Sequence, residues 1–283
     1  MKINHADLAD SFYEVAGNIR SGERTVKALL TGRENAADNY KLAYSYGEKG
    51  SEWATPRHRH AFEQVRHPLE GDYSIGKNKV LRAGWVGYFP ESAYYGPQVM
   101  SPNLKMVVLQ YGGPSGRGFY SIPQRKAAMD VLKTKGTFSN GIFSWVDEQG
   151  THHNQDAGEA VWEQMFNEKM VYPPSRYEDL IMINPANFDW IKDENVPGVS
   201  HKRLGTFSER DVRIGFIKVD AGASLRFGAE RAAEVLFLKE GSVQHDGQAH
   251  PRLSAFSSEA AETPETLEAL EPTEFFYVKM PTF

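Results

Sequence analysis

The residue types best suited to chemistry lie in residues 56–71, where His58 and His60 stand two positions apart. Alternate side chains of a β-strand share a face and lie roughly 6.6 Å apart along it, so both imidazoles should project in the same direction. Where such a strand curves, as barrel strands do, the two rings can reach one metal ion at about 2.0–2.1 Å. The spacing therefore predicts a metal site, against the alternative of a plain strand pair without metal.

The same alternation sorts the residues that follow the histidines. Phe62, Gln64 and Arg66 should continue the histidine face, and Glu63 should take the other face. Gln64 rather than Glu63 is therefore the expected further ligand, unless its amide bonds a neighbouring strand. Arg66 is the expected clamp for a substrate carboxylate, because a planar guanidinium fits a carboxylate bidentately. The alternative for Arg66 is an internal ion pair, for example with Glu91.

A second pair of histidines, His152 and His153, is adjacent in sequence. Neighbouring residues point to different sides of an extended chain, and this segment leads into a predicted helix. We therefore expect a surface loop there and no metal. The chain contains no cysteine, which excludes disulfides, a thiolate nucleophile and cysteine-ligated zinc.

The segments that must position these residues read as short strands. Aromatic and β-branched residues dominate them, and clusters of Gly, Pro or Asn separate them, which is typical of an all-β sandwich or barrel. In the first half these runs are 40–46, 62–67, 80–89 and 104–111, and in the second half they are 212–219, 233–239 and 274–278.

The middle of the chain reads as helical. One helix should begin at Ser121, a capping residue followed by an early proline, and should stop near Gly136. A second should run from Asp156, which can cap it, to Met170, because apolar residues recur along one stripe. We therefore predict an N-terminal extension at 1–23 containing a short helix, a first barrel at 24–115, a partly helical linker at 116–205 and a second barrel at 206–283.

An internal repeat supports two related barrels. His58, His60, Gln64 and Gly71 have counterparts in Gly228, Glu230, Glu234 and Gly241, all at one offset of 170 residues. The second unit therefore keeps the spacing of the first and lacks both histidines.

This pattern resembles the cupin superfamily, whose first motif is Gly, five residues, His-x-His, three or four residues, Glu, six residues, Gly. The chain supplies His58, His60 and Gly71, and it has Gln64 in place of the glutamate and Glu52 in place of the leading glycine. The resemblance implies two double-stranded β-helix (jelly-roll) barrels, of which the second is degenerate.

The second cupin motif is Gly, five residues, Pro-x-Gly, two residues, His, three residues, Asn. The chain matches it at Gly84 and Pro90, with Ser92 at the second glycine and Tyr95 at the histidine. Gln98 is the other candidate from this segment for closing the metal shell begun by the two histidines and Gln64. Tyr95 could close that shell too, or could act as a proton donor or acceptor beside the metal, because a nearby cation lowers the pKa of a phenol.

Within the superfamily, one run is similar to gentisate-type ring-cleaving dioxygenases: His58-Arg-His60, then Arg66, then Glu70-Gly71. Those enzymes are bicupins that hold iron with three histidines. The resemblance implies oxygen chemistry, whereas Tyr95 at the third histidine position favours non-redox chemistry.

Composition argues against two classes of binding partner, nucleic acids and membranes. The formal net charge of −5 argues against nucleic acid, which selects basic patches. No window approaches the roughly 20 apolar residues of a membrane span, and the first residues lack a secretory pattern, so we expect a cytoplasmic protein.

The resulting hypothesis is a metal-dependent enzyme that acts on a small oxygenated molecule, carboxylated or aromatic, with one divalent ion (Fe, Mn, Ni or Zn) in the first barrel. We favour an oxygenase over an isomerase, cyclase or lyase, and the rival class is a non-catalytic small-molecule-binding bicupin. A homodimer is expected, because pairing through sheets removes exposed edge strands.

Overall fold

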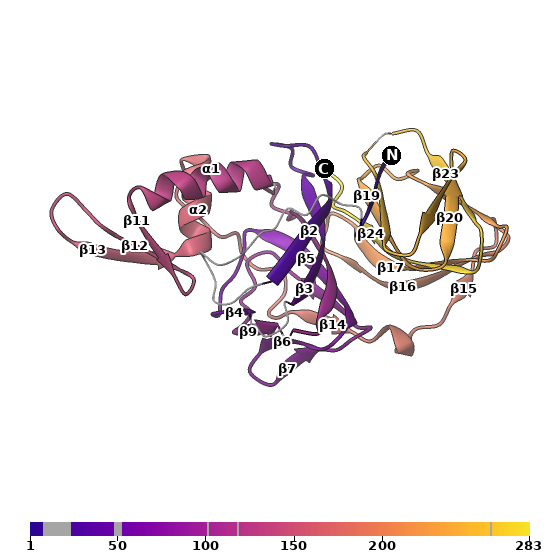
Figure 1. The fold of residues 1–283 in the computed structure, drawn as a ribbon, viewed down its shortest axis with the longest axis horizontal. Coiled ribbons are helices and arrows are strands. Elements are labelled where there is room, and N and C mark those ends of the chain that lie inside the picture. Colours follow the sequence, from indigo (N-terminus) through magenta and orange to yellow (C-terminus); the bar gives the residue numbers. More distant parts are fainter. Residues whose placement is uncertain (8–23, 48–52, 101, 118, 261) are drawn as a thin grey trace.

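Two large antiparallel sheets dominate the computed structural model, which describes residues 1–7, 24–47, 53–100, 102–117, 119–260 and 262–283. Each large sheet lies with a smaller four-stranded sheet, so that the described chain forms two barrel-like β-units side by side (Figure 1). The predicted all-β organisation in two barrels is confirmed.

The first β-unit has a six-stranded sheet in the order β14-β8-β5-β10-β3-β2 and a smaller sheet in the order β4-β9-β6-β7. Its strands are β2 (Arg24–Thr31), β3 (Tyr40–Gly47), β4 (Trp53–Thr55), β5 (Phe62–Glu70), β6 (Tyr73–Gly76), β7 (Lys79–Leu81), β8 (Val86–Phe89), β9 (Gln98–Met100), β10 (Lys105–Gly112) and β14 (Ile181–Ile183). The predicted strand 80–89 is two strands, because the chain turns at Gly84, whose φ of 79° suits glycine.

The second β-unit has a seven-stranded sheet in the order β1-β22-β19-β24-β17-β16-β15 and a smaller sheet in the order β18-β23-β20-β21. Its strands are β1 (Lys2–His5), β15 (Ile191–Lys192), β16 (Val199–Phe207), β17 (Val212–Val219), β18 (Ser224–Phe227), β19 (Glu234–Glu240), β20 (Ser242–His245), β21 (Gln248–Pro251), β22 (Ser254–Ser258), β23 (Glu265–Ala269) and β24 (Thr273–Lys279).

The start of the chain is a strand where a short helix was expected. β1 pairs with β22 of the second β-unit, so backbone hydrogen bonds to that sheet edge decide its conformation. The remainder of the predicted helix, residues 8–23, lies outside the described residues.

The segment between the barrels forms a separate insertion that projects at the left of Figure 1. It contains helix α1 (Ile122–Lys133), strands β11 (Gly136–Ser139), β12 (Ile142–Val146) and β13 (His152–Asp156), and helix α2 (Ala157–Phe166). Both expected caps are confirmed: Ser121 forms a capping box with Gln124, and the Asp156 side chain accepts two backbone N–H bonds. Helix α2 stops before the predicted Met170, because its C-cap residue Asn167 is left-handed with φ of 52°.

The expected surface loop at His152 and His153 is wrong. Both residues lie in β13, where Trp145 of β12 pairs with His153 and stacks on its ring at a centroid distance of 5.0 Å. The His153 ring nitrogen Nε2 lies 2.7 Å from the Asp147 carboxylate, so this histidine contacts residues of its own hairpin. This segment is a strand because it pairs with β12, and two adjacent histidines in the sequence do not predict such pairing.

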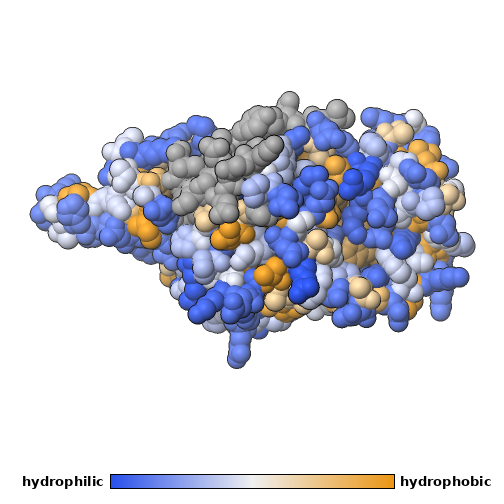
Figure 2. Space-filling view, turned by 60° about the horizontal axis from the view of Figure 1, so that its bottom comes forward, coloured by the Kyte–Doolittle hydropathy of each residue, from blue (hydrophilic) through white to orange (hydrophobic). Residues whose placement is uncertain are grey.

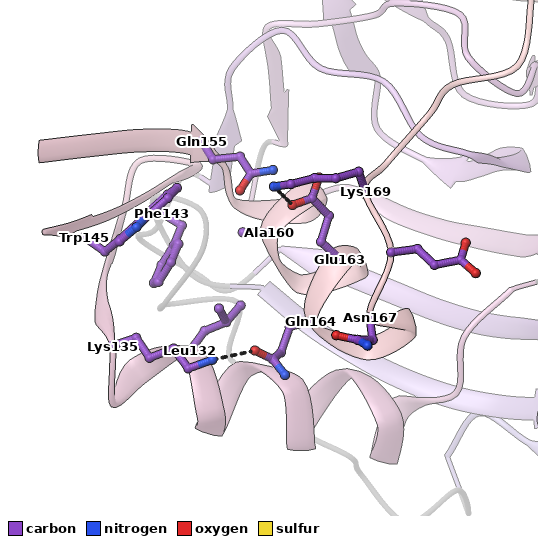
Figure 3. Close-up of a pocket in the computed structure, with 11 residues that line it drawn as sticks. Leu132, Lys135, Phe143, Trp145, Gln155, Ala160, Glu163, Gln164, Asn167 and Lys169 are labelled. Atoms are coloured by element: carbon purple, nitrogen blue, oxygen red, sulfur yellow. Dashed lines mark hydrogen bonds and ion pairs between the residues drawn. The ribbon is translucent and has the colours of Figure 1, made fainter. Parts of the chain in front are cut away.

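The insertion also carries a surface pocket of about 360 Å³ between α1, α2 and its small sheet, and Figure 3 shows the residues that line it. Lys169 bonds Glu163 and Lys135 bonds Gln164 across this pocket. None of its lining residues is a histidine.

The two large sheets pack against each other through one shared apolar core. From the first β-unit this core takes Val65, Leu109 and Tyr88, and from the second it takes Phe237 and Val278. Such burial is the main stabilising term in folding, at roughly 25 cal/mol per Å² of apolar surface removed from water. The outer face of each large sheet is therefore buried inside this chain. The rest of the surface visible in Figure 2 is mostly hydrophilic, with scattered apolar residues.

Strands β14, β15 and most of β16 come from the range predicted as the linker, and they join the large sheets. The repeat offset of 170 residues fits the fold. Gly71 follows β5 and Gly241 follows β19, and both adopt a positive φ, of 72° and 84°, at the equivalent turn. In the described part of the chain, no helix is long and apolar enough to cross a membrane.

Candidate metal and substrate site in the first barrel

The site is built on three neighbouring strands of the first sheet. Gln110 of β10 pairs with Gln64 of β5 on one side and with Lys41 of β3 on the other. Directly paired residues of antiparallel strands project from the same face, so these three side chains share the barrel interior. Arg66, two residues after Gln64, continues that face.

The opposite face of β5 points to the other barrel. Val65 belongs to the core between the sheets, and the His67 ring contacts Phe216 and Phe276 at centroid distances of 5.4 and 5.0 Å. Glu63 is also on this face and is 1% exposed. Burial raises the pKa of the Glu63 carboxyl to about 8, although the hydroxyl of Tyr88 donates to it.

The two histidines precede β5 and lie outside it. His58 forms an isolated antiparallel bridge with Tyr95, in which each backbone N–H donates to the other residue's carbonyl at 2.9 Å. The rings of His58 and His60 are 4.9 Å apart between centroids and inclined by 72°. The two imidazoles therefore lie side by side, as expected. They do not belong to a strand, however, and the isolated bridge to Tyr95 keeps this part of the chain extended.

A hydrogen bond sets which nitrogen of His58 carries the proton. Its Nδ1 lies 2.7 Å from the carbonyl oxygen of Pro56. A carbonyl can only accept, so Nδ1 carries the hydrogen and Nε2 carries the lone pair that a metal would use. A hydrogen bond from the ring to a backbone carbonyl is the kind that orients histidine ligands in metal sites.

Both histidines face a cavity of about 110 Å³ that the first barrel and the insertion enclose together. Two of its walls come from outside the barrel: Arg125 lies on α1, and Gly158 and Val161 lie on α2. The residues that line it are Arg24, Lys41, Trp53, His58, His60, Phe62, Arg66, Gln98, Gln110, Tyr120, Arg125, Gly158 and Val161. This described lining contains no aspartate or glutamate.

The structure favours Gln98 over Gln64 as the amide ligand. Gln98 of β9 is fully buried, lines the cavity, and has neither amide atom hydrogen-bonded in the described part of the protein. In Gln64, the amide oxygen accepts hydrogen bonds from Arg66 at 2.8 Å and from Gln110 at 3.1 Å, and the amide nitrogen donates to the Tyr95 hydroxyl. The alternative expected for Gln64, an amide bonded to a neighbouring strand, is the arrangement seen.

Arg66 is buried, with 6% of its surface exposed, and its partners are neutral. One terminal nitrogen donates to the Tyr73 hydroxyl at 2.9 Å, the other donates to Gln64, and Nε is unpartnered among the described residues. The suggested ion pair with Glu91 is wrong, because the Glu91 carboxylate instead lies 3.4 Å from Arg176.

Tyr95 lies behind the histidines, outside the cavity lining. Its ring contacts His58 at 4.5 Å and Phe89 at 5.1 Å between centroids, and its hydroxyl accepts from Gln64. In this position it can hold the imidazoles and the Gln64 amide in place. The predicted role of Tyr95 as a proton donor stays untested.

Sequence reasoning missed Lys41 and Tyr120, together with the arginines Arg24 and Arg125. One signal for Lys41 was present, since it stands in the otherwise aromatic and apolar run Tyr-Lys-Leu-Ala-Tyr. Burial, and to a smaller extent the charge of Arg24, lowers the pKa of Lys41 to about 8. Glu52, which stands at the leading glycine of the first motif, lies outside the described residues.

A divalent ion fits the metal-ligating groups of the described cavity lining, which are all neutral. Among the described residues no cluster of three or more His, Cys, Asp or Glu side chains could hold a metal. The two imidazoles and the buried amide of Gln98, unpartnered among the described residues, supply three ligand atoms, and imidazole suits zinc, iron and nickel. Such a shell leaves the ionic charge unneutralised, so an anionic ligand would complete it.

The equivalent place in the second barrel has different chemistry. Glu230 and Glu234 occupy the positions of His60 and Gln64. Glu234 accepts a hydrogen bond from the Tyr277 hydroxyl at 2.7 Å, and Glu230 pairs with Arg213 at 2.9 Å. These carboxylates are thus engaged by protein partners.

Comparisons with known proteins agree on the fold. No family model matches the sequence, and no curated protein matches it. A proposed dioxygenase from Nostoc punctiforme matches with a TM-score of 0.62 at 9% identity, over 99% of this chain and 82% of that chain. The protein Ylba from E. coli matches with a TM-score of 0.55 at 10% identity, over 98% of this chain and 89% of that one.

A third solved structure is oxalate decarboxylase from Bacillus subtilis, a protein described with Mn(II) centres. It matches with a TM-score of 0.50 at 14% identity, over 99% of this chain and 79% of that chain. The finer similarity to gentisate-type enzymes is not tested by these structures. Taken with the two β-units and their repeat, the matches show that the chain has a two-barrel cupin fold.

Proposed function

We propose that this chain is a metal-dependent enzyme that acts on a small carboxylated molecule in the first barrel. The observation that carries the proposal is the placement of His58 and His60, with ring centroids 4.9 Å apart, on a cavity that also receives the unpartnered amide of Gln98. Buried polar groups normally have hydrogen-bond partners, so an orphaned amide beside two imidazoles points to a missing ligand.

A bound divalent ion would supply Lewis-acid stabilisation of negative charge on a substrate oxygen. The protein's own residues do the rest. Arg66 would orient the substrate carboxylate through its fork of N–H donors, with Gln64 and Tyr73 holding the guanidinium in place. Gly158 and Val161 of α2 would keep bulk water out of the cavity.

The reaction class stays a choice between two candidates. The similarity of residues 58–71 to gentisate-type dioxygenases favours an oxygenase, which is our first candidate. The second is a non-redox isomerase, cyclase or lyase, and Tyr95 favours it, because this residue stands at the third histidine position with its hydroxyl bonded to Gln64. Oxygen-electrode traces on iron-loaded protein with a panel of small hydroxylated and carboxylated acids separate them: substrate conversion without oxygen uptake overturns the oxygenase.

The proposal is tested first by metal content. We expect the protein to retain a divalent metal at close to one ion per chain after purification without a tag, and a His58→Ala/His60→Ala variant to lose it. The matched control is His152→Ala/His153→Ala, which removes the other histidine pair in the insertion. Equal metal in wild type and the His58/His60 variant overturns the site and favours a non-catalytic binding protein. The homodimer and the cytoplasmic location stay predictions.

A further inference from the structure

Among the described residues, the first barrel holds a buried positive charge that lacks an anionic partner. Arg66 lines the cavity, is 6% exposed, and within the described ranges bonds only the neutral oxygens of Tyr73 and Gln64. Removing an arginine from water costs free energy that a neutral acceptor offsets only in part. The two buried glutamates Glu63 and Glu91 do not compensate it: Glu63 is on the other face of β5, and Glu91 bonds Ser115 and Arg176.

A second cation faces the same cavity from two strands away. Lys41 of β3 and Gln64 of β5 both pair with Gln110 of β10, so the backbones of Lys41 and Gln64 are roughly 10 Å apart at the usual strand spacing. The Lys41 ammonium has no ion pair among the described residues. Burial lowers the pKa of this amine to about 8, as expected where no anion stabilises the charged form.

The cavity is small. Its volume of about 110 Å³ lies well below the roughly 300–1,000 Å³ of pockets that take drug-sized ligands. A short aliphatic molecule suits this space better than a substituted aromatic ring. Its described lining carries no acidic side chain to repel an anion.

We infer that the cavity binds a short dicarboxylate as a dianion, with one carboxylate on Arg66 and the other on Lys41. This inference rests on the proposed function for its catalytic meaning, because it names the substrate class of the same site. Binding itself needs only the two cations, so it should persist in protein without metal. Arg66 would take its carboxylate through paired N–H donors, and Lys41 would act as a point charge for the other.

The test is calorimetric titration of the chelator-treated full chain with malonate and succinate. The probes for comparison are the monomethyl ester of malonate, which is a monoanion, and malonamide, which is neutral. We expect at least one dicarboxylate to bind about tenfold more tightly than the monoester, the effect of one additional charge contact, and malonamide not to bind. Equal binding of dianion and monoester overturns the inference.

Variants test which cation binds which carboxylate of the ligand. Lys41→Gln should bind the dianion and the monoester within about twofold of each other, whereas Lys105→Gln, an exposed lysine of β10 that pairs with Glu70, should keep the wild-type preference. Because Arg66 is buried, Arg66→Gln is used only if its circular dichroism spectrum matches wild type, and it should weaken both ligands. A preference for the dianion that survives in Lys41→Gln overturns the assignment.

The His58→Ala/His60→Ala variant separates this inference from the proposed function. Dianion binding that persists in this variant supports the cation site, whether or not wild type holds metal. Metal in wild type together with no dianion preference in the chelator-treated protein overturns the dicarboxylate and leaves the metal enzyme in place.

Discussion

Glu63 gives the sharpest test of the packing between the two barrels. Its carboxyl is 1% exposed on the face of β5 that meets the second barrel, and burial raises its pKa from 4.5 to about 8. Between pH 4.5 and 8 the folded protein therefore holds a proton that the unfolded chain has released. Its stabilising contribution is complete below pH 4.5 and is lost as pH rises through 8.

The size of the effect follows from that interval. At about 1.4 kcal/mol for each pH unit, the change from 4.5 to about 8 corresponds to at most roughly 5 kcal/mol of unfolding free energy. Glu63→Gln keeps the shape of the side chain and cannot ionise. The variant should therefore lose this part of the pH dependence. Its stability relative to wild type should rise from pH 5 to about pH 8 and level off above that.

Urea unfolding followed by tryptophan fluorescence at each pH measures this difference. Glu70→Gln, at the exposed end of the same strand, controls for the removal of one negative charge. Parallel pH profiles for wild type and Glu63→Gln would refute the reasoning, because they would mean that this carboxyl titrates alike in the folded and unfolded chain.

Three further predictions concern the site, the interface and a helix cap. Gln98→Leu should lower metal content at least severalfold and Gln64→Ala should lower it less, whereas Glu63→Gln should leave it unchanged; elemental analysis checks all three. Burial lowers the pKa of His67 to about 3. The neutral ring's contribution to the free energy of unfolding is therefore complete above pH 6.5 and is lost as pH falls towards 3. His67→Phe should therefore flatten the acid limb of a urea-unfolding pH profile. Ser121→Ala should cost about 1 kcal/mol, because it removes the capping box of α1, and the thermal midpoint should fall.

The second barrel packs against the sheet of the first barrel that carries the site. Phe237 and Val278 of its large sheet pack against Val65 and Leu109 behind the site. His67 also contacts this sheet through Phe216 and Phe276. The strand that carries Gln64 and Arg66 therefore contacts the second barrel on the side opposite the cavity.

The sequence alone determined what depends on neighbours along the chain. Strand alternation placed Phe62 and Arg66 on the cavity face and Glu63 on the other, because the side-chain period of a strand is a local property. The capping residues Ser121 and Asp156 marked both helices for the same reason. The repeat at one offset indicated two related barrels, which the fold bears out.

Only the tertiary structure decided which distant residues complete the site. Gln98 and Lys41 come from β9 and β3, and strand register, which local sequence does not specify, brings Lys41 level with Gln64 across β10. Helix α2 was expected only as part of a linker, and its packing over the barrel mouth makes it a wall of the cavity. Long-range packing also engaged the Gln64 amide with protein donors, because burial leaves few polar groups without a partner.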